Sequence, residues 1–235
     1  MMKYKAIVFD VSDTLIEYSP NYAKIFGDRL RSLGFEVSED KAQEISKMIN
    51  WTIGEQNCRE SHGAPHLLES ELNKLLDNAA LRCITDESNY SQEYLSKLNK
   101  IPMPKQEMNV ISGVFNVLNI IKNKYRLAIV SNHYTWLMDY LDKMNLTSYF
   151  KAIVISENVG ISKPDIRIMQ ILLNELELEA KDCLYVGDQP MDVLCSKGIG
   201  MDCAWIADNE YILPETIPFK EDYRINRLTD LLNIL

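Results

Sequence analysis

The sequence predicts an α/β fold in which helices cover both faces of an open parallel sheet, with a helical domain inserted into it. Short apolar runs rich in β-branched or aromatic residues recur along the chain, and amphipathic helical patterns lie between several of them. Strands that alternate with helices form parallel sheets buried on both faces. The stretch from residue 18 to 101 shows helical patterns only, which predicts the insertion.

The predicted strands are short and bounded by polar residues or glycine, as expected for buried parallel strands. They lie at residues 6–9, 127–130, 152–155, 183–186, 203–206 and 222–225. Apolar residues three and four positions apart predict helices over 114–121, 138–144 and 168–176, and a closing helix over 228–235. Together these elements predict a Rossmann-like core formed by residues 1–17 and 102–235.

The inserted segment carries apolar residues at helical spacing over 25–33, 45–53, 68–76 and 94–98. Gly34 interrupts this pattern, and Pro102 and Pro104 end it. We therefore expect residues 18–101 to form a helical cap. The chain would cross twice between the cap and the core, with a cleft where the two meet.

Composition excludes several classes of function. The 235 residues include 34 Asp and Glu against 25 Lys and Arg, a net charge of −9, whereas nucleic-acid binding needs a basic surface. No apolar run approaches the roughly 18 residues of a membrane span. The first nine residues are too short for a secretory signal. We expect a cytoplasmic protein without nucleic-acid or membrane partners, and its oligomeric state stays open.

Chemically active side chains follow the predicted strands. Asp10 follows the first strand, Ser131 ends the second and Asp188 follows the fourth. Lys163 lies in the loop after the third strand, and Asp192 comes one helical turn after Asp188. Ligands of open parallel sheets bind beyond the carboxyl ends of the strands, so we expect these five side chains to converge.

This combination of side chains favours phosphoryl transfer. Clustered carboxylates repel one another unless a hard cation neutralises them, and oxygen ligands suit Mg²⁺. A carboxylate beside such a cation can attack phosphorus and form an aspartyl phosphate. A lysine and the cation then offset the charge on the transferring group, while a serine hydroxyl and backbone N–H groups hold its remaining oxygens.

Four motifs occur in order along the chain, and together they carry a family resemblance. They are Asp10 through Thr14, Ser131, Lys163, and the Gly187-Asp188 pair followed by Asp192. A chain with these motifs resembles the haloacid dehalogenase superfamily of hydrolases, in the group with a helical cap inserted after the first motif. The resemblance covers the core, about two thirds of the chain.

The resemblance implies a role for each matching residue. Asp10 would be the nucleophile and would bind Mg²⁺ together with the backbone carbonyl of Ser12 and the carboxylate of Asp188. Asp192 would bind the metal directly, bind it through water, or orient Lys163.

Substrate contacts are expected from the core and from the cap. The resemblance implies that Ser131 and Lys163 hold the phosphoryl group, and Asn132 begins the loop beside them. The segment 59–66 looks like a loop between two cap helices, and Arg59 is its best candidate for contacting an anion. His133 could contact the substrate or simply begin a helix.

One position departs from the family pattern. Phosphatases of the superfamily usually carry an Asp two residues after the nucleophile, where it protonates the leaving group and then activates water. Here that residue is Ser12, which is a poor general acid or base near neutral pH. Asp13 could take over the role, or it could stabilise the loop.

Three functions therefore stay open. The first is a Mg²⁺-dependent phosphatase of a small phosphorylated metabolite, and the second a 2-haloacid dehalogenase or phosphonate hydrolase. The third is a non-catalytic binder of a phosphorylated ligand. The retained Asp188 and Asp192 favour the first, because the resemblance implies that the dehalogenases need no cation and lack this acidic pair.

Overall fold

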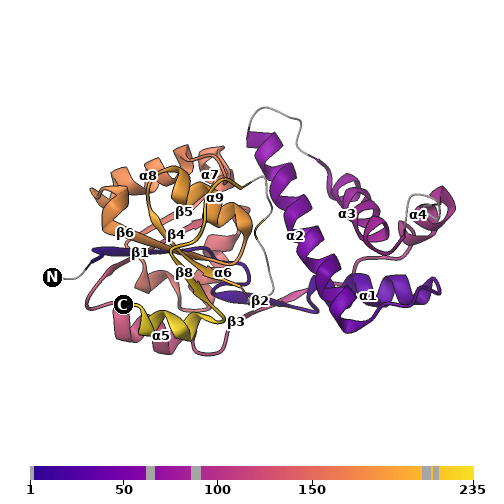
Figure 1. Cartoon of the computed structure of the whole chain (residues 1–235), viewed down its shortest axis with the longest axis horizontal. Helices are drawn as coiled ribbons and strands as arrows, with labels where there is room; N and C mark the ends of the chain where they lie inside the picture. The colour runs from indigo at the N-terminus through magenta and orange to yellow at the C-terminus, as the bar shows by residue number, and fades with distance from the viewer. Residues whose placement is uncertain (1–2, 62–66, 86–90, 208–212, 214–216) are drawn as a thin grey trace. The chain divides into compact units, whose positions relative to one another are not determined.

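The computed structural model describes residues 3–61, 67–85, 91–207, 213 and 217–235. The chain divides into two compact units (Figure 1). Residues 1–17 and 109–235 form the first, called here the core unit, and residues 18–108 form the second, called the helical unit.

The core unit contains a six-stranded parallel sheet with the order β5-β4-β1-β6-β7-β8. The strands are β1 (Ala6–Phe9), β4 (Arg126–Ser131), β5 (Ala152–Ile155), β6 (Cys183–Gly187), β7 (Asp202–Ile206) and β8 (Tyr223–Ile225). The predicted α/β fold with a parallel sheet is confirmed, because every predicted apolar run forms a strand.

Helices lie on both faces of this sheet. They are α5 (Val114–Ile121), α6 (Leu137–Lys143), α7 (Ser156–Val159), α8 (Arg167–Leu176) and α9 (Pro190–Gly198). Apolar residues of α8 and α9 join alternate strand residues in one buried cluster. Figure 1 shows α5 on the other side of the sheet, beside the last helix. That helix, the predicted closing helix, is a 3₁₀ helix (Leu228–Asn233).

Strand register aligns the ends of the three central strands. Phe9 pairs with Ile129 of β4 and with Val186 of β6. The backbone N–H of Asp10 also donates to the carbonyl of Val186, over 2.9 Å. The residues that follow β1, β4 and β6 therefore meet at the carboxyl edge of the sheet.

The helical unit contains α1 (Tyr22–Ser32), α2 (Glu39–Ser61), α3 (Glu69–Ile84) and α4 (Gln92–Leu98), which enclose a separate apolar cluster. Two strands were not predicted: β2 (Ile16–Ser19) and β3 (Glu107–Val110) pair as a ribbon where the chain passes between the units. Their residues alternate between exposed and covered, so they contain no buried apolar run of the kind that indicated the other strands. Among the residues that the structure describes, no helix is both long and apolar enough to span a membrane.

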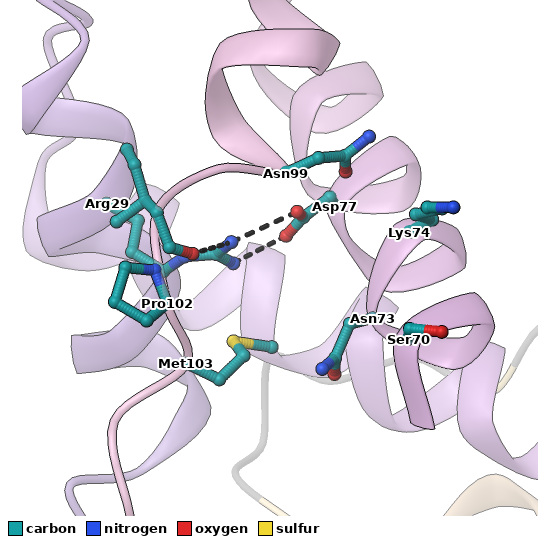
Figure 2. Close-up of a pocket in the computed structure, with 9 residues that line it drawn as sticks. Arg29, Ser70, Asn73, Lys74, Asp77, Asn99, Pro102 and Met103 are labelled. Atoms are coloured by element: carbon teal, nitrogen blue, oxygen red, sulfur yellow. Dashed lines mark hydrogen bonds and ion pairs between the residues drawn. The ribbon is translucent and has the colours of Figure 1, made fainter. Parts of the chain in front are cut away.

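A buried ion pair joins the helices of the helical unit (Figure 2). Arg29 of α1 donates to Asp77 of α3 through its two terminal guanidinium nitrogens, over 2.5 and 3.0 Å. The same guanidinium donates to the carbonyls of Leu98 and Ile101, each over 2.9 Å. A pocket of about 180 Å³ lies beside the pair and is lined by none of the predicted catalytic residues. Arg29 therefore ties α1 to α3 and to the end of α4.

Replacing Asp77 with Ala should destabilise the helical unit. The change leaves Arg29 buried without its counter-charge, and breaking a buried pair in this way costs about 3–5 kcal/mol. Urea denaturation followed by circular dichroism measures the loss. Asp28→Ala is the matched control, because Asp28 pairs with Lys24 and Arg31 on the exposed surface. Equal stabilities for the two variants would contradict a stabilising role for the buried pair.

Candidate active site

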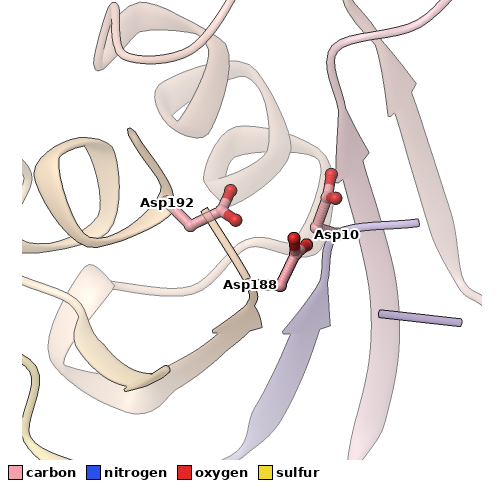
Figure 3. Close-up of side chains that lie close together, drawn as sticks. All are labelled: Asp10, Asp188 and Asp192. Atoms are coloured by element: carbon pink, nitrogen blue, oxygen red, sulfur yellow. The ribbon is translucent and has the colours of Figure 1, made fainter. Parts of the chain in front are cut away.

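Three carboxylates meet at the carboxyl edge of the sheet (Figure 3). Asp10 follows β1, Asp188 follows β6, and Asp192 lies in the first turn of α9. One carboxylate oxygen from each lies within 4.8 Å of the other two. The expected convergence of these strand-end residues is therefore present, and the set could hold a metal ion.

Lys163 lies against two of the three carboxylates. Its Nζ donates to Oδ1 of Asp10 over 2.7 Å, to Oδ1 of Asp192 over 2.6 Å and to the hydroxyl of Tyr185 over 2.8 Å. The lysine is 4% exposed. Burial alone would lower its pKa, but the charges of Asp10 and Asp192 outweigh that effect and raise the pKa above its usual value. Lys163 is thus held in its charged form.

Asp192 receives hydrogen bonds at both carboxylate oxygens. Oδ1 accepts from Lys163 and is 3.1 Å from the Tyr185 hydroxyl, and Oδ2 accepts from the backbone N–H of Gln189 over 2.9 Å. Gly187 makes this position possible, because a Cβ there would collide with Oδ2 and lie 2.5 Å from Cγ of Asp192. The fourth motif therefore needs a glycine at this position, because any side chain would displace the Asp192 carboxylate.

Asp188 has a different environment. Oδ1 accepts from the hydroxyl of Thr14 over 3.2 Å, and Oδ2 accepts from the side-chain amide of Gln189. Both donors are neutral. Burial and the nearby charges of Asp13, Asp10 and Asp192 raise the pKa of Asp188 well above its usual range. A bound cation would offset the negative charges that raise this pKa.

Ser131 ends β4, and Asn132 is the next residue. Ser131 is buried. Oδ1 of Asn132 accepts from the backbone N–H of Lys163 over 2.7 Å, and Nδ2 donates to the backbone carbonyl of the same lysine over 2.9 Å. Asn132 therefore anchors the Lys163 backbone, a role that the sequence did not indicate. A contact between Asn132 and substrate stays a prediction.

The first motif forms a tight turn between β1 and β2. Ser12 bridges to Ile16, and Asp13 adopts the left-handed region with φ 55°. Asp13 is exposed, yet the surrounding chain desolvates its carboxyl. Together with the charges of Asp10 and Glu17, this desolvation raises its pKa to about 6.

Two other candidates lie farther along the chain. The backbone N–H of His133 donates to the hydroxyl of Ser156 over 3.0 Å. Burial lowers the pKa of the His133 imidazole. Arg59 was predicted in a loop, but this was wrong: α2 continues to Ser61, and Arg59 is exposed in its last turn. Residues 62–66 of this segment lie outside the described residues, so the substrate contact expected of Arg59 stays a prediction.

Tyr185 was missed by the sequence reasoning. It was assigned only to a strand, although a hydroxyl in an otherwise apolar central strand needs a hydrogen-bond partner. In the structure its hydroxyl is within hydrogen-bond distance of Lys163, Asp192 and the carbonyl of Val130.

Comparisons with known proteins point to one group of hydrolases. A family model described as haloacid dehalogenase-like hydrolase matches residues 7–206. A phosphoglycolate phosphatase of Pseudomonas fluorescens is 25% identical over 206 residues, covering 86% of this chain and 69% of the relative.

Solved structures share the fold. The HAD-hydrolase YfnB of Bacillus subtilis, bound to magnesium, has a TM-score of 0.64 at 20% identity, covering 100% of this chain and 99% of that one. A 2-haloacid dehalogenase of Pseudomonas syringae has a TM-score of 0.56 at 20% identity, covering 98% and 97%.

Gly187→Ala should displace Asp192 from Lys163. The new methyl group has no space, and overpacking of this kind costs about 1–3 kcal/mol. Urea denaturation and a crystal structure of the variant measure the loss and the displacement. The control is Gly198→Ala at the other end of α9, where the nearest atom is Cγ2 of the exposed Ile166, 3.1 Å away. An undisplaced Asp192 would show that the space argument is wrong.

Proposed function

Because the chain belongs to the haloacid dehalogenase-like hydrolase family, we propose that it is a Mg²⁺-dependent phosphatase of a small phosphorylated metabolite. The observation that carries the proposal is the buried contact between the Asp10 carboxylate and Lys163, with Asp188 beside it. A carboxylate held next to a fixed cationic group is suited to attack phosphorus. The phosphatase name of the Pseudomonas fluorescens relative supports the same reaction.

The donor set fits Mg²⁺. The available ligands are all oxygens, as a hard cation requires, and we assign them to Asp10, Asp188 and the backbone carbonyl of Ser12. Asp192 instead orients Lys163, because its carboxylate is fully buried and contacts the Lys163 ammonium over 2.6 Å. The donors to Asp188 are both neutral. When bound, the cation would neutralise charge on the phosphoryl group and on the carboxylates.

In the proposed reaction Asp10 attacks in line. Lys163 holds Oδ1 of Asp10, and the other carboxylate oxygen forms the bond to phosphorus while the bond to the leaving oxygen breaks. The positive charge of Lys163 offsets charge on the transferring group, and the Ser131 hydroxyl donates to one of its oxygens. A water molecule then attacks the aspartyl phosphate, which releases phosphate and restores Asp10.

Protonation of the leaving oxygen lacks the family's usual general acid in this scheme. Ser12 occupies the position of the usual general acid, and a missing general acid typically costs about 10²–10⁴ in rate. We propose that water or the substrate itself supplies this proton. Such an enzyme would be slow, or specialised for leaving groups that need little protonation.

Dehalogenation is the second candidate, because the fold is shared with a 2-haloacid dehalogenase. The Asp10 carboxylate could attack carbon in place of phosphorus. Two assays separate the reactions: phosphate release from a panel of phosphorylated metabolites with Mg²⁺, and halide release from a 2-haloacid in EDTA. Halide release without phosphate release would replace the phosphatase proposal. A protein that releases neither but binds a panel member would be a phospho-ligand binder.

Asp10→Asn should lower phosphatase turnover by at least about 10³-fold, because the amide cannot serve as the nucleophile. Initial rates on the best panel substrate measure the change, and circular dichroism checks the fold. Asp182→Asn is the matched control, since Asp182 pairs with Lys5 before β6, away from the acidic cluster. Turnover that survives the loss of the Asp10 carboxylate would refute the mechanism.

Ser12→Asp should raise the phosphatase rate if leaving-group protonation limits turnover. The new carboxyl would supply a general acid at the position where the family usually carries one, and the gain could reach about 10²-fold. Steady-state kinetics with substrates of differing leaving-group pKa test this, and the largest gain is expected for the poorest leaving group. An active protein with no gain would indicate that Asp13 already acts as the acid or that the protein catalyses another reaction.

A further inference from the structure

Tyr185 lies at the centre of the sheet, beneath the acidic cluster. Its strand β6 lies between β1 and β7, and its side chain is fully buried. The hydroxyl accepts from Lys163 over 2.8 Å. It lies 3.0 Å from the carbonyl of Val130 and 3.1 Å from Oδ1 of Asp192, either of which can accept its proton.

The number of donors on Lys163 makes this contact significant. An ammonium group has three N–H donors, and the structure gives three acceptors: Asp10, Asp192 and Tyr185. Two of these acceptors are carboxylates and the third is neutral. With all three N–H groups engaged, the ammonium has a single orientation in the site.

The neutrality of the third acceptor has a consequence for charge. A third carboxylate would fix the ammonium equally well, but it would add negative charge where a phosphoryl group must bind. A purely apolar side chain would leave one buried N–H without an acceptor, which is costly and would allow the ammonium to tilt. A tyrosine hydroxyl avoids both problems.

We propose that Tyr185 is a positioning residue, whose hydroxyl fixes the Lys163 ammonium between Asp10 and Asp192 without adding negative charge. The structural part of this inference stands without any enzymatic activity, whereas its kinetic consequence rests on the proposed phosphatase function. The competing explanation is that Tyr185 only fills the core and satisfies the Val130 carbonyl.

Tyr185→Phe separates these explanations, because it keeps the buried ring and removes only the hydroxyl. Tyr4→Phe is the matched control. Tyr4 is also buried, and its hydroxyl lies 2.8 Å from Asp202 and 3.1 Å from Tyr223. It precedes β1, at the opposite edge of the sheet from the acidic cluster. Both variants lose hydrogen bonds of a buried tyrosine, so a general loss of stability should appear in both.

The first measurement needs no substrate. In the full-length protein labelled with ¹⁵N-lysine, the Lys163 ammonium should give a slowly exchanging NMR signal with contacts to the ring of residue 185. Tyr185→Phe should broaden or abolish this signal, and Tyr4→Phe should leave it unchanged. A signal that persists unchanged in Tyr185→Phe would overturn the proposal.

The second measurement is kinetic, with Mg²⁺ and the best substrate of the panel. A small misplacement of a catalytic group costs up to about 10²-fold in rate, so kcat of Tyr185→Phe should fall by about 10- to 100-fold. KM should change far less, and Tyr4→Phe should retain both constants. Unchanged kcat in Tyr185→Phe would also overturn the proposal. If the wild-type protein releases no phosphate, the proposed function fails, and the NMR comparison still decides the role of Tyr185.

Discussion

The buried contact of Lys163 with Asp10 and Asp192 is the constraint on which the rest of the core unit depends. It joins the end of β1, the loop before α8 and the first turn of α9. Removing these charges from water is costly and is offset only when each is fully hydrogen-bonded. The neighbouring residues meet this requirement, since Asn132 holds the lysine backbone and Gly187 leaves space for Asp192.

Charge at the site explains why a cation belongs in the proposed reaction. Three carboxylates lie close together, and Lys163 contacts two of them, while the third, Asp188, accepts from the neutral side chains of Thr14 and Gln189. The chain as a whole carries a net charge of −9, which repels an anionic substrate at long range. A phosphorylated substrate therefore needs a local positive field that Lys163 alone does not supply. In the proposal, Mg²⁺ beside Asp188 supplies the rest.

The sequence predicted the strands and the carboxylates that follow them, but it did not predict individual contacts between side chains of different elements. Apolar runs predicted the strands of the sheet, and the residues after them predicted which carboxylates converge. The contact of Tyr185 with Lys163 could not be predicted, because it joins a strand interior to a loop 22 residues earlier. The helical position of Arg59 was also missed, since the charged and polar residues around it resemble a loop.

The two carboxylates that follow β6 have different environments and are therefore suited to different roles. Asp188 and Asp192 are four residues apart, on either side of the start of α9. Asp192 is fully buried, and its negative charge is matched by Lys163 and by hydrogen bonds at both oxygens. Asp188 is half-buried, its donors are neutral, and burial together with the neighbouring carboxylates raises its pKa. Asp192 is therefore suited to pair with Lys163, and Asp188 is the carboxylate of this pair that is suited to bind a metal ion.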